Sequence, residues 1–242
     1  MPKGHYKIFY TSDLSGKEAY VLVDLIEDSS LYPIIIDTEI RLIYFQAETP
    51  YAKVKTPNIN GILGDKMTAF APRTTGIKLG TNKEMEIAKQ LFDVASLFDH
   101  ADNFTEVKKS FVAVAEKEIK YRDLKIGHEE VLIDSFNAAM IIAFQGSMEK
   151  EIYNELQEGT KKLKGYIFNN FGHSEVHICA AKIAYLSQAI QKGVDKTVVS
   201  FNNEDLSKAE IKNKEFSRLN KIKKISPAAF YYWKAAIDLL TE

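Results

Sequence analysis

In the first 45 residues, apolar and aromatic positions form short runs that are typical of β-strands. The three runs are YKIFY from Tyr6, AYVLVDLIE from Ala19 and YPIIIDTEIRLIYF from Tyr32 to Phe45. The first two are separated by Ser12–Lys17, a turn-forming linker short enough to join antiparallel neighbours. We therefore expect a β-hairpin at the start of the chain, followed by a third strand.

From Asn58 onward, the apolar positions recur at intervals of three and four residues, which is the period of an amphipathic helix. The helices predicted in this way are Asn58–Ala71, Lys83–Asp99, Thr105–Tyr121, His128–Gln145, Met148–Leu163, His173–Gln191, Leu206–Lys212 and Pro227–Thr241. The pattern changes within residues 47–58, a linker so short that the strands and the helices are expected to pack together.

Composition narrows the class of protein further. With 242 residues, 45% of them hydrophobic, the chain can bury a sizeable core. Its 32 basic residues nearly balance 33 acidic ones, so any site for a polyanion must be local. No run approaches the roughly 20 apolar residues that span a bilayer, so we expect a cytoplasmic protein without a membrane partner. The sole cysteine, Cys179, excludes an intrachain disulfide and is expected to be a buried, small apolar side chain.

Lys66 stands out within the first predicted helix. The apolar stripe of that helix consists of Ile59, Ile62, Leu63, Met67 and Phe70. Lys66 falls on the same face. Three interpretations are open: its ammonium reaches solvent along its own stem, it pairs with a carboxylate such as Asp24 or Asp93, or it points into a polar cleft.

The segment Val54–Phe98 contains motifs with a family resemblance. It combines a proline-led helix entry, the lysine motif GDKMTAFAPR, and a helix KQLFDVASLF that fits the form D-L-x-D-L-x-x-L. The preceding strand YVLVDLIE carries a late acidic residue, Asp24. In these motifs and their order, the chain resembles the nucleotidyl transferase AbiEii/AbiGii toxin family.

The resemblance implies an α+β fold, with part of a mixed nucleotidyltransferase sheet at the N-terminus and a predominantly helical C-terminal region. It implies a core over residues 1–122 and a helical domain over residues 123–242. It also implies an enzyme that binds a nucleoside triphosphate with Mg²⁺ and transfers nucleotide to an RNA such as tRNA. Family members are toxins of toxin–antitoxin pairs, some of them in abortive defence against phage, so an antitoxin is the implied protein partner.

The resemblance also assigns residues. Lys66 corresponds to the motif lysine, Asp93 to the acid of the following helix and Asp24 to the late strand carboxylate, which gives three expected catalytic residues. Asp24 is the expected metal ligand. Asp65 and Arg73, from the same motif as Lys66, are expected to contribute with it to nucleotide binding.

The chain departs from the pattern at its start. Nucleotidyltransferases of this superfamily open with a glycine-serine or glycine-glycine turn and, roughly ten residues later, a D-x-D or D-x-E pair that holds magnesium. The sole Gly-Ser dipeptide here is Gly146-Ser147, between two predicted helices. We therefore expect a member that lacks the N-terminal portion, and one strand carboxylate is too few for two-metal transfer. The open sheet edge predicts self-association or pairing with another chain.

The residues leave alternatives open. Asp93 lies on a polar helical stripe that could be a solvated face, and Asp24 on an otherwise apolar strand that reads as central, where it could bond to backbone. His173 and His177 have a spacing that can ligate a metal, with no third ligand identified. The basic segment Ser207–Lys224 could contact RNA or be a solvated surface. The functional alternative to an enzyme is a non-catalytic helical module that binds a protein.

Overall fold

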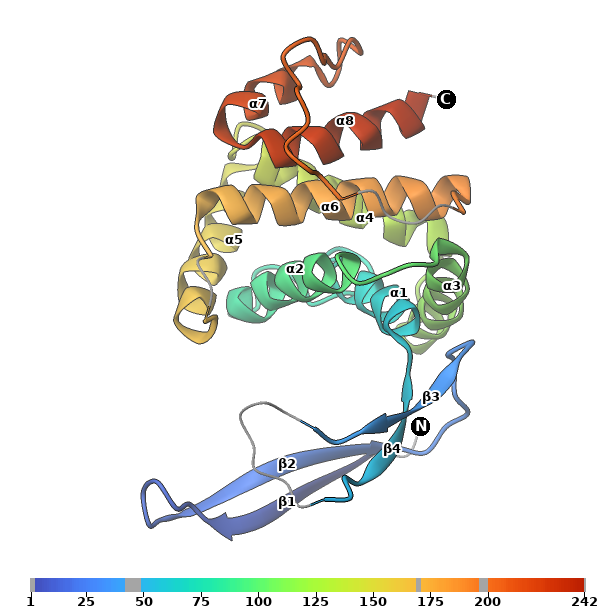
Figure 1. Ribbon diagram of the computed structural model, residues 1–242, viewed down its shortest axis with the longest axis vertical. Helices are drawn as coiled ribbons and strands as arrows, with labels where there is room; N and C mark the ends of the chain where they lie inside the picture. The colour runs from blue at the N-terminus through green and yellow to red at the C-terminus, as the bar shows by residue number, and fades with distance from the viewer. Residues whose placement is uncertain (1–2, 42–48, 169–170, 196–199, 242) are drawn as a thin grey trace. The chain divides into compact units, whose positions relative to one another are not determined.

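The computed structural model describes residues 3–41, 49–168, 171–195 and 200–241. The backbone divides into two compact units, Met1–Leu31 and Tyr32–Glu242, and the first consists of strands while the second is mainly helical (Figure 1). The expected α+β class is therefore confirmed. A domain boundary at residue 122 stays a prediction.

The N-terminal unit is the expected hairpin. Strand β1 (Lys3–Thr11) pairs with β2 (Glu18–Ile26) in an antiparallel register that runs from Lys3 opposite Ile26 to Thr11 opposite Glu18. The turn between them places Gly16 at a φ of 63°, a left-handed conformation that glycine adopts without a steric cost.

Both faces of this hairpin are open to solvent in the described structure. Side chains that point to opposite faces, Val21 and Leu22, are 53% and 56% exposed. The prediction of a central strand for Asp24 is wrong for the described residues, because β2 pairs with β1 alone. The apolar character of both faces had suggested burial on both sides, which neighbouring strands or other chains would have to supply.

A second hairpin begins the C-terminal unit. Strand β3 (Ile35–Glu39) pairs antiparallel with β4 (Lys53–Pro57), which leads directly into the first helix (Figure 1). The expected third strand is thus confirmed in its first half, while its residues 42–45 lie outside the described part. The expected mixed sheet is replaced by two separate two-stranded antiparallel sheets within the described residues. Parallel pairing needs a long crossover connection, and the six-residue turn after β1 is too short for one.

Eight α-helices follow in the described residues. They are α1 (Ile59–Ala69), α2 (Glu84–Phe98), α3 (Phe104–Tyr121), α4 (His128–Ala143), α5 (Lys150–Leu163), α6 (His173–Lys192), α7 (Ile222–Ile225) and α8 (Pro227–Thr241). Short 3₁₀ turns cover Lys164–Tyr166 and Ser217–Lys221. Seven of the predicted helices are confirmed, and each of their ends lies within two residues of the predicted one. In these segments the apolar period and the capping residues indicate the same helix ends.

The predicted helix Leu206–Lys212 is wrong. This segment has no helical backbone, and side chains satisfy part of its hydrogen bonding instead. Asp205 accepts a hydrogen bond from the Ser207 amide at 2.9 Å, and Asn220 bonds both the amide and the carbonyl of Ile211. Local bonds of this kind compete with helix formation.

The helices pack in layers around one core. Helix α1 lies against α3, α2 lies against α5 and α6, and α6 runs between α4 and α8 (Figure 1). Phe98, Phe111 and Trp233 are among the fully buried side chains. Gly64 allows α1 and α3 to approach closely, since a Cβ atom there would lie 2.4 Å from the Val107 carbonyl oxygen. In the described residues, none of the helices is long and apolar enough to cross a membrane.

Candidate functional site: a lysine–aspartate cluster between α1 and α2

Helix α1 presents Lys66 from the edge of its buried face. Asn58 caps the helix by accepting a hydrogen bond from the Gly61 amide at 2.9 Å. The predicted apolar stripe is buried at Leu63, Met67 and Phe70, whereas Ile59 at its start is 43% exposed. Burial of the stripe fixes the rotation of α1, so the Lys66 stem runs along the boundary between the core and solvent.

Helix α2 supplies the partner of Lys66. The Lys66 ammonium lies 3.2 Å from the Asp93 carboxylate and donates a hydrogen bond to the Gln90 side-chain oxygen, also at 3.2 Å. The two charged side chains are 31% and 21% exposed. Of the three interpretations of Lys66, the structure therefore shows pairing with Asp93, in a position that solvent still reaches.

A second lysine shares the same carboxylate. Lys89 lies one helical turn before Asp93, and its ammonium contacts the same carboxylate oxygen as Lys66, at 2.6 Å. Two ammonium groups on one carboxylate leave this cluster with a net charge of about +1. If the motif D-L-x-D-L is laid on QLFDV, Gln90 takes the place of its first acid, so the cluster lacks a second negative charge. The excess positive charge suits an anionic ligand.

Asp65, next to Lys66, makes a different contact. Its carboxylate accepts a hydrogen bond of 2.7 Å from the Tyr32 hydroxyl, which ties the chain before β3 to α1. Burial, followed by this hydrogen bond, raises the pKa of Tyr32, so Tyr32 stays a donor. Neighbouring helical residues point about 100° apart, which separates Asp65 from the Lys66 contacts. The expected part of Asp65 in nucleotide binding stays a prediction.

Arg73 is held at both its backbone and its side chain. The Arg73 amide donates to Asp134 on α4 at 2.8 Å, and its guanidinium pairs with Glu149 just before α5. The hydrogen bond to Glu149 raises the pKa of Arg73 and lowers the pKa of Glu149. Arg73 thus anchors the loop after α1, and the described contacts do not bring it to Lys66. Its role in nucleotide binding stays a prediction.

Asp134 is a structural acid that the sequence analysis did not single out. It is 6% exposed, and one of its oxygens accepts from the Arg73 amide and from the Thr74 hydroxyl at 2.9 Å. Its other oxygen has no hydrogen-bond partner within the described residues. Burial raises the pKa of Asp134. The one available signal was an isolated acid among the apolar residues of VLIDSF.

Asp24 belongs to the other compact unit, on β2. Its carboxylate bonds the His5 ring at 2.7 Å, across the hairpin, and both side chains are well exposed. The sequence analysis gave a hydrogen bond to the backbone as the alternative role of Asp24. The structure shows a contact with the His5 side chain instead. The predicted catalytic and metal-binding roles of Asp24 stay predictions.

The described residues do not fit a bound Mg²⁺ ion. Nowhere in that part of the chain do three acidic, histidine or cysteine side chains converge as ligands. Asp93, the carboxylate at Lys66, is already occupied by two ammonium groups. Hard divalent cations take several oxygen ligands, so a metal here would need carboxylates beyond those described.

The remaining candidates have structural partners. The rings of His173 and His177 lie together, with 3.2 Å between their Nε2 atoms, and within the described residues no third metal ligand joins them. Cys179 is buried as predicted, and burial raises its pKa to about 12. In the basic segment, Arg218 covers the Phe144 ring at 5.1 Å. Contact of this segment with RNA stays a prediction.

Comparison with known proteins adds a decisive observation. Residues 2–166 match the model of the family described as nucleotidyl transferase AbiEii toxin, Type IV TA system. The chain belongs to this family. No curated protein and no solved structure matches it.

Membership of the AbiEii family confirms the resemblance drawn from the motifs. All five predicted site residues, from Asp24 to Asp93, fall within the match. The family supports a nucleotidyltransferase-like role in a toxin–antitoxin system, with a nucleotide substrate and an antitoxin partner. Helices α6 to α8 lie outside the matched residues.

Proposed function

We propose that this AbiEii-family protein acts as a toxin that transfers nucleotide from a nucleoside triphosphate to an RNA acceptor, with tRNA as the expected acceptor. The observation that carries the proposal is the positively charged cluster of Lys66, Lys89 and Asp93. It lies on two family motifs, is partly open to solvent, and has more positive than negative charge.

The three side chains have separate roles in this proposal. Lys66, a compact charge on a flexible stem, binds the triphosphate. Asp93 positions the Lys66 ammonium before the nucleotide arrives and releases it when Lys66 turns to the phosphate. Lys89, 53% exposed at its side chain, keeps a cation on Asp93 during that exchange. Because Gln90 is neutral, it adds no negative charge that would repel the incoming phosphate.

Divalent metal would supply charge neutralisation for the transferring phosphoryl group. The residues that we describe do not form a site for it, so no step is assigned to a metal ion. Asp24 remains the proposed metal ligand.

A non-catalytic role is the second candidate. Lys66 has one carboxylate partner in the described residues, whereas two-metal transfer needs several acids around the ions. A helical module that binds a protein, such as an antitoxin, needs no such acids. The number of acids thus favours the module, and the excess positive charge and the partial exposure of Lys66 favour the enzyme.

The deciding experiment incubates purified protein with Mg²⁺, total tRNA and each labelled ribonucleoside triphosphate in turn. The Lys66→Ala variant is compared with Lys150→Ala, a matched change at an exposed lysine for which the described residues show no ion pair. The proposal expects transfer by the wild type and by Lys150→Ala, and a loss of at least about tenfold in Lys66→Ala, equivalent to about 1.4 kcal/mol. Absence of transfer by folded wild-type protein would leave the binding module.

We also propose a partner for the N-terminal hairpin. Both its strand edges and its apolar faces are exposed, with Phe9 at 57% and Ile8 at 58%. Exposed strand edges pair readily with further strands. Self-association or binding of an antitoxin would cover them, and sedimentation analysis of the protein alone distinguishes the two. A monomer would exclude self-association. A cytoplasmic location stays a prediction.

A further inference from the structure

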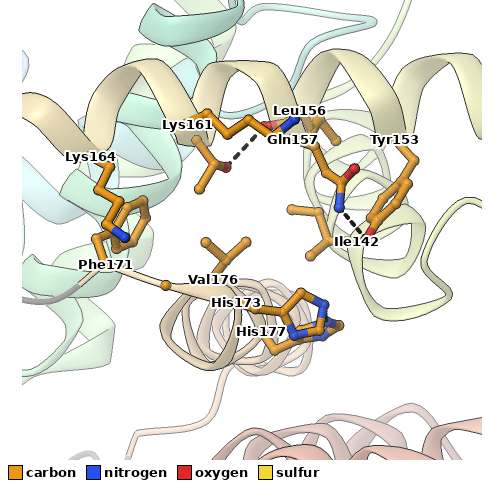
Figure 2. Close-up of a pocket in the computed structure, with 12 residues that line it drawn as sticks. Ile142, Tyr153, Leu156, Gln157, Lys161, Lys164, Phe171, His173, Val176 and His177 are labelled. Carbon is orange, nitrogen blue, oxygen red and sulfur yellow. Dashed lines mark hydrogen bonds between the residues drawn. The ribbon is translucent and has the colours of Figure 1, made fainter.

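A cavity of about 220 Å³ lies between α4, α5 and the start of α6, and none of the predicted site residues lines it. Ile142, Leu156 and Val176 form much of its apolar wall, one from each helix (Figure 2). Pockets for drug-sized ligands measure roughly 300–1,000 Å³, so this cavity suits a smaller ligand, such as one planar ring system.

Two aromatic rings lie on opposite sides of the cavity. Figure 2 shows Phe171, beside Lys164, across the space from Tyr153. Phe171 is 3% exposed and is held in place by an edge-on contact with Phe92 of α2, with 5.3 Å between the ring centres. Aromatic walls favour a flat, unsaturated ligand, because stacking on such rings contributes roughly 1–3 kcal/mol per nucleobase.

A hydrogen-bonding pair lies beside one of these rings. The Gln157 amide donates to the Tyr153 hydroxyl at 2.8 Å. The Tyr153 proton and the Gln157 carbonyl oxygen have no partner among the residues that the structure describes. This arrangement offers a donor and an acceptor close together, which is the pattern that the edge of a nucleobase recognises.

The lysine of the 3₁₀ turn supplies a cation at the cavity. Lys161 is paired with Glu158 at 2.6 Å, whereas Lys164 has no carboxylate partner within the described ranges. Lys164 is exposed and lines the cavity. It is therefore placed to contact a negatively charged group attached to a ring bound inside.

His177 adds a buried ring nitrogen without a partner to the lining. It is 1% exposed, and its Nε2 atom lies 3.2 Å from Nε2 of His173 and 3.4 Å from the side-chain nitrogen of Gln145. Its other ring nitrogen, Nδ1, has no hydrogen-bond partner in the described structure. A buried polar atom without a partner is costly, and a ligand or water that forms a hydrogen bond with Nδ1 would relieve that cost.

We infer that this cavity binds one unstacked nucleobase, and that Lys164 contacts the phosphate next to it. The base belongs either to an RNA or to a free nucleotide, which share this chemistry. Where the base belongs to RNA, the inference rests on the proposed function and makes the cavity an acceptor-holding site beside the transfer site.

The test measures binding by calorimetry in the Lys66→Ala background, which removes the proposed triphosphate contact. The probes are the four nucleoside monophosphates and a short single-stranded RNA. Val176→Phe fills the cavity, while Gln157→Ala and Lys164→Gln change exposed residues of its lining. Lys150→Gln, at the other end of α5, is the matched control.

We expect at least about a tenfold loss of affinity in Val176→Phe. Lys164→Gln should weaken binding and reduce its salt dependence by roughly one phosphate contact. Gln157→Ala should change the preference among bases, and Lys150→Gln should bind as its parent does. Tighter binding of RNA than of monophosphates identifies RNA as the source, and the reverse identifies free nucleotide. Absence of binding, or equal binding by Val176→Phe and Lys164→Gln in folded protein, overturns the inference.

Failure of the proposed function is distinguishable from this result. Base binding in the Lys66→Ala background, together with a wild-type protein that transfers no nucleotide, refutes the transferase and leaves the cavity site standing. Nucleotide transfer by the wild type, with no base binding in the Lys66→Ala background, refutes the cavity site and leaves the transferase.

Discussion

Burial of His177 predicts that the protein loses stability in mild acid. The ring is 1% exposed, and burial, with a smaller contribution from the neighbouring His173, lowers the pKa of His177 from its ordinary 6.5 to about 4. Because the folded pKa lies below the unfolded one, the unfolded state binds the proton more tightly. Stability from this group is therefore complete above the unfolded pKa and is lost as the pH falls toward 4.

The magnitude follows from the shift. The full difference corresponds to about 3 kcal/mol at 1.36 kcal/mol per pKa unit. Between about pH 7.5 and pH 5, the linkage relation gives a loss of about 2 kcal/mol in the free energy of unfolding. His177→Gln removes the titrating group, and the variant should lack this loss. His100→Gln, the same change at an exposed histidine, should behave as the wild type does.

Urea unfolding can be followed by the fluorescence of Trp233, the sole tryptophan of the chain, which is fully buried. Each protein is unfolded at both pH values, and the differences between the two free energies are compared. A loss of stability that the substitution causes equally at both pH values cancels in this comparison. An equal pH dependence in the wild type and in His177→Gln would refute the argument from burial.

Four further outcomes are expected. Gly64→Ala should lower the free energy of unfolding by about 1–3 kcal/mol, because a Cβ atom there would lie 2.4 Å from the Val107 carbonyl oxygen. Gly165→Ala is the control, since a Cβ atom at that position meets nothing within 4 Å and should change stability little. Thermal melts of the two variants and the wild type measure the difference. Asp134→Ala should lower the free energy of unfolding by roughly 1–3 kcal/mol, because it leaves the Arg73 amide without an acceptor. Asp134→Asn keeps an acceptor oxygen and should lower the free energy of unfolding by less. Since burial raises the pKa of Asp134, its contribution to stability falls as pH rises through the folded pKa, and Asp134→Asn should remove this dependence in chemical denaturation. Cys179, with its pKa raised to about 12, should react with iodoacetamide at neutral pH only after unfolding, as mass spectrometry can show.

The sequence predicted those features that depend on neighbours along the chain. The helical period and local caps located α1 to α6 and α8, and the spacing in α1 placed Lys66 at the edge of a buried face. The helix predicted over Leu206–Lys212 does not form, and the sequence pattern did not reveal this. One of the side chains that bond its backbone, Asn220, lies nine residues after Ile211. The prediction of a mixed sheet with a central strand was wrong for a similar reason. A strand with two apolar faces indicates burial, but the sequence does not show which part of the molecule would cover those faces.

The cluster around Lys66 was predictable in part. Its partner Asp93 follows from the family motif, whereas the sharing of Asp93 with Lys89 and the contact with Gln90 depend on the rotation of α2. Asp134 escaped prediction because its partner is a backbone amide 61 residues earlier, a contact that leaves no pattern in side-chain types.

The residues outside the family match contribute to the site that lies inside it. Helix α2 carries Asp93, and its other face packs against α6, which follows the matched segment. Lys182 of α6 pairs with Asp99 at 2.6 Å, just after α2 ends, and Phe171 contacts Phe92 beside Asp93. Since the rotation of α2 decides whether Asp93 reaches Lys66, the geometry of the charged cluster depends on α6. The same helix forms one wall of the cavity for which we infer a nucleobase.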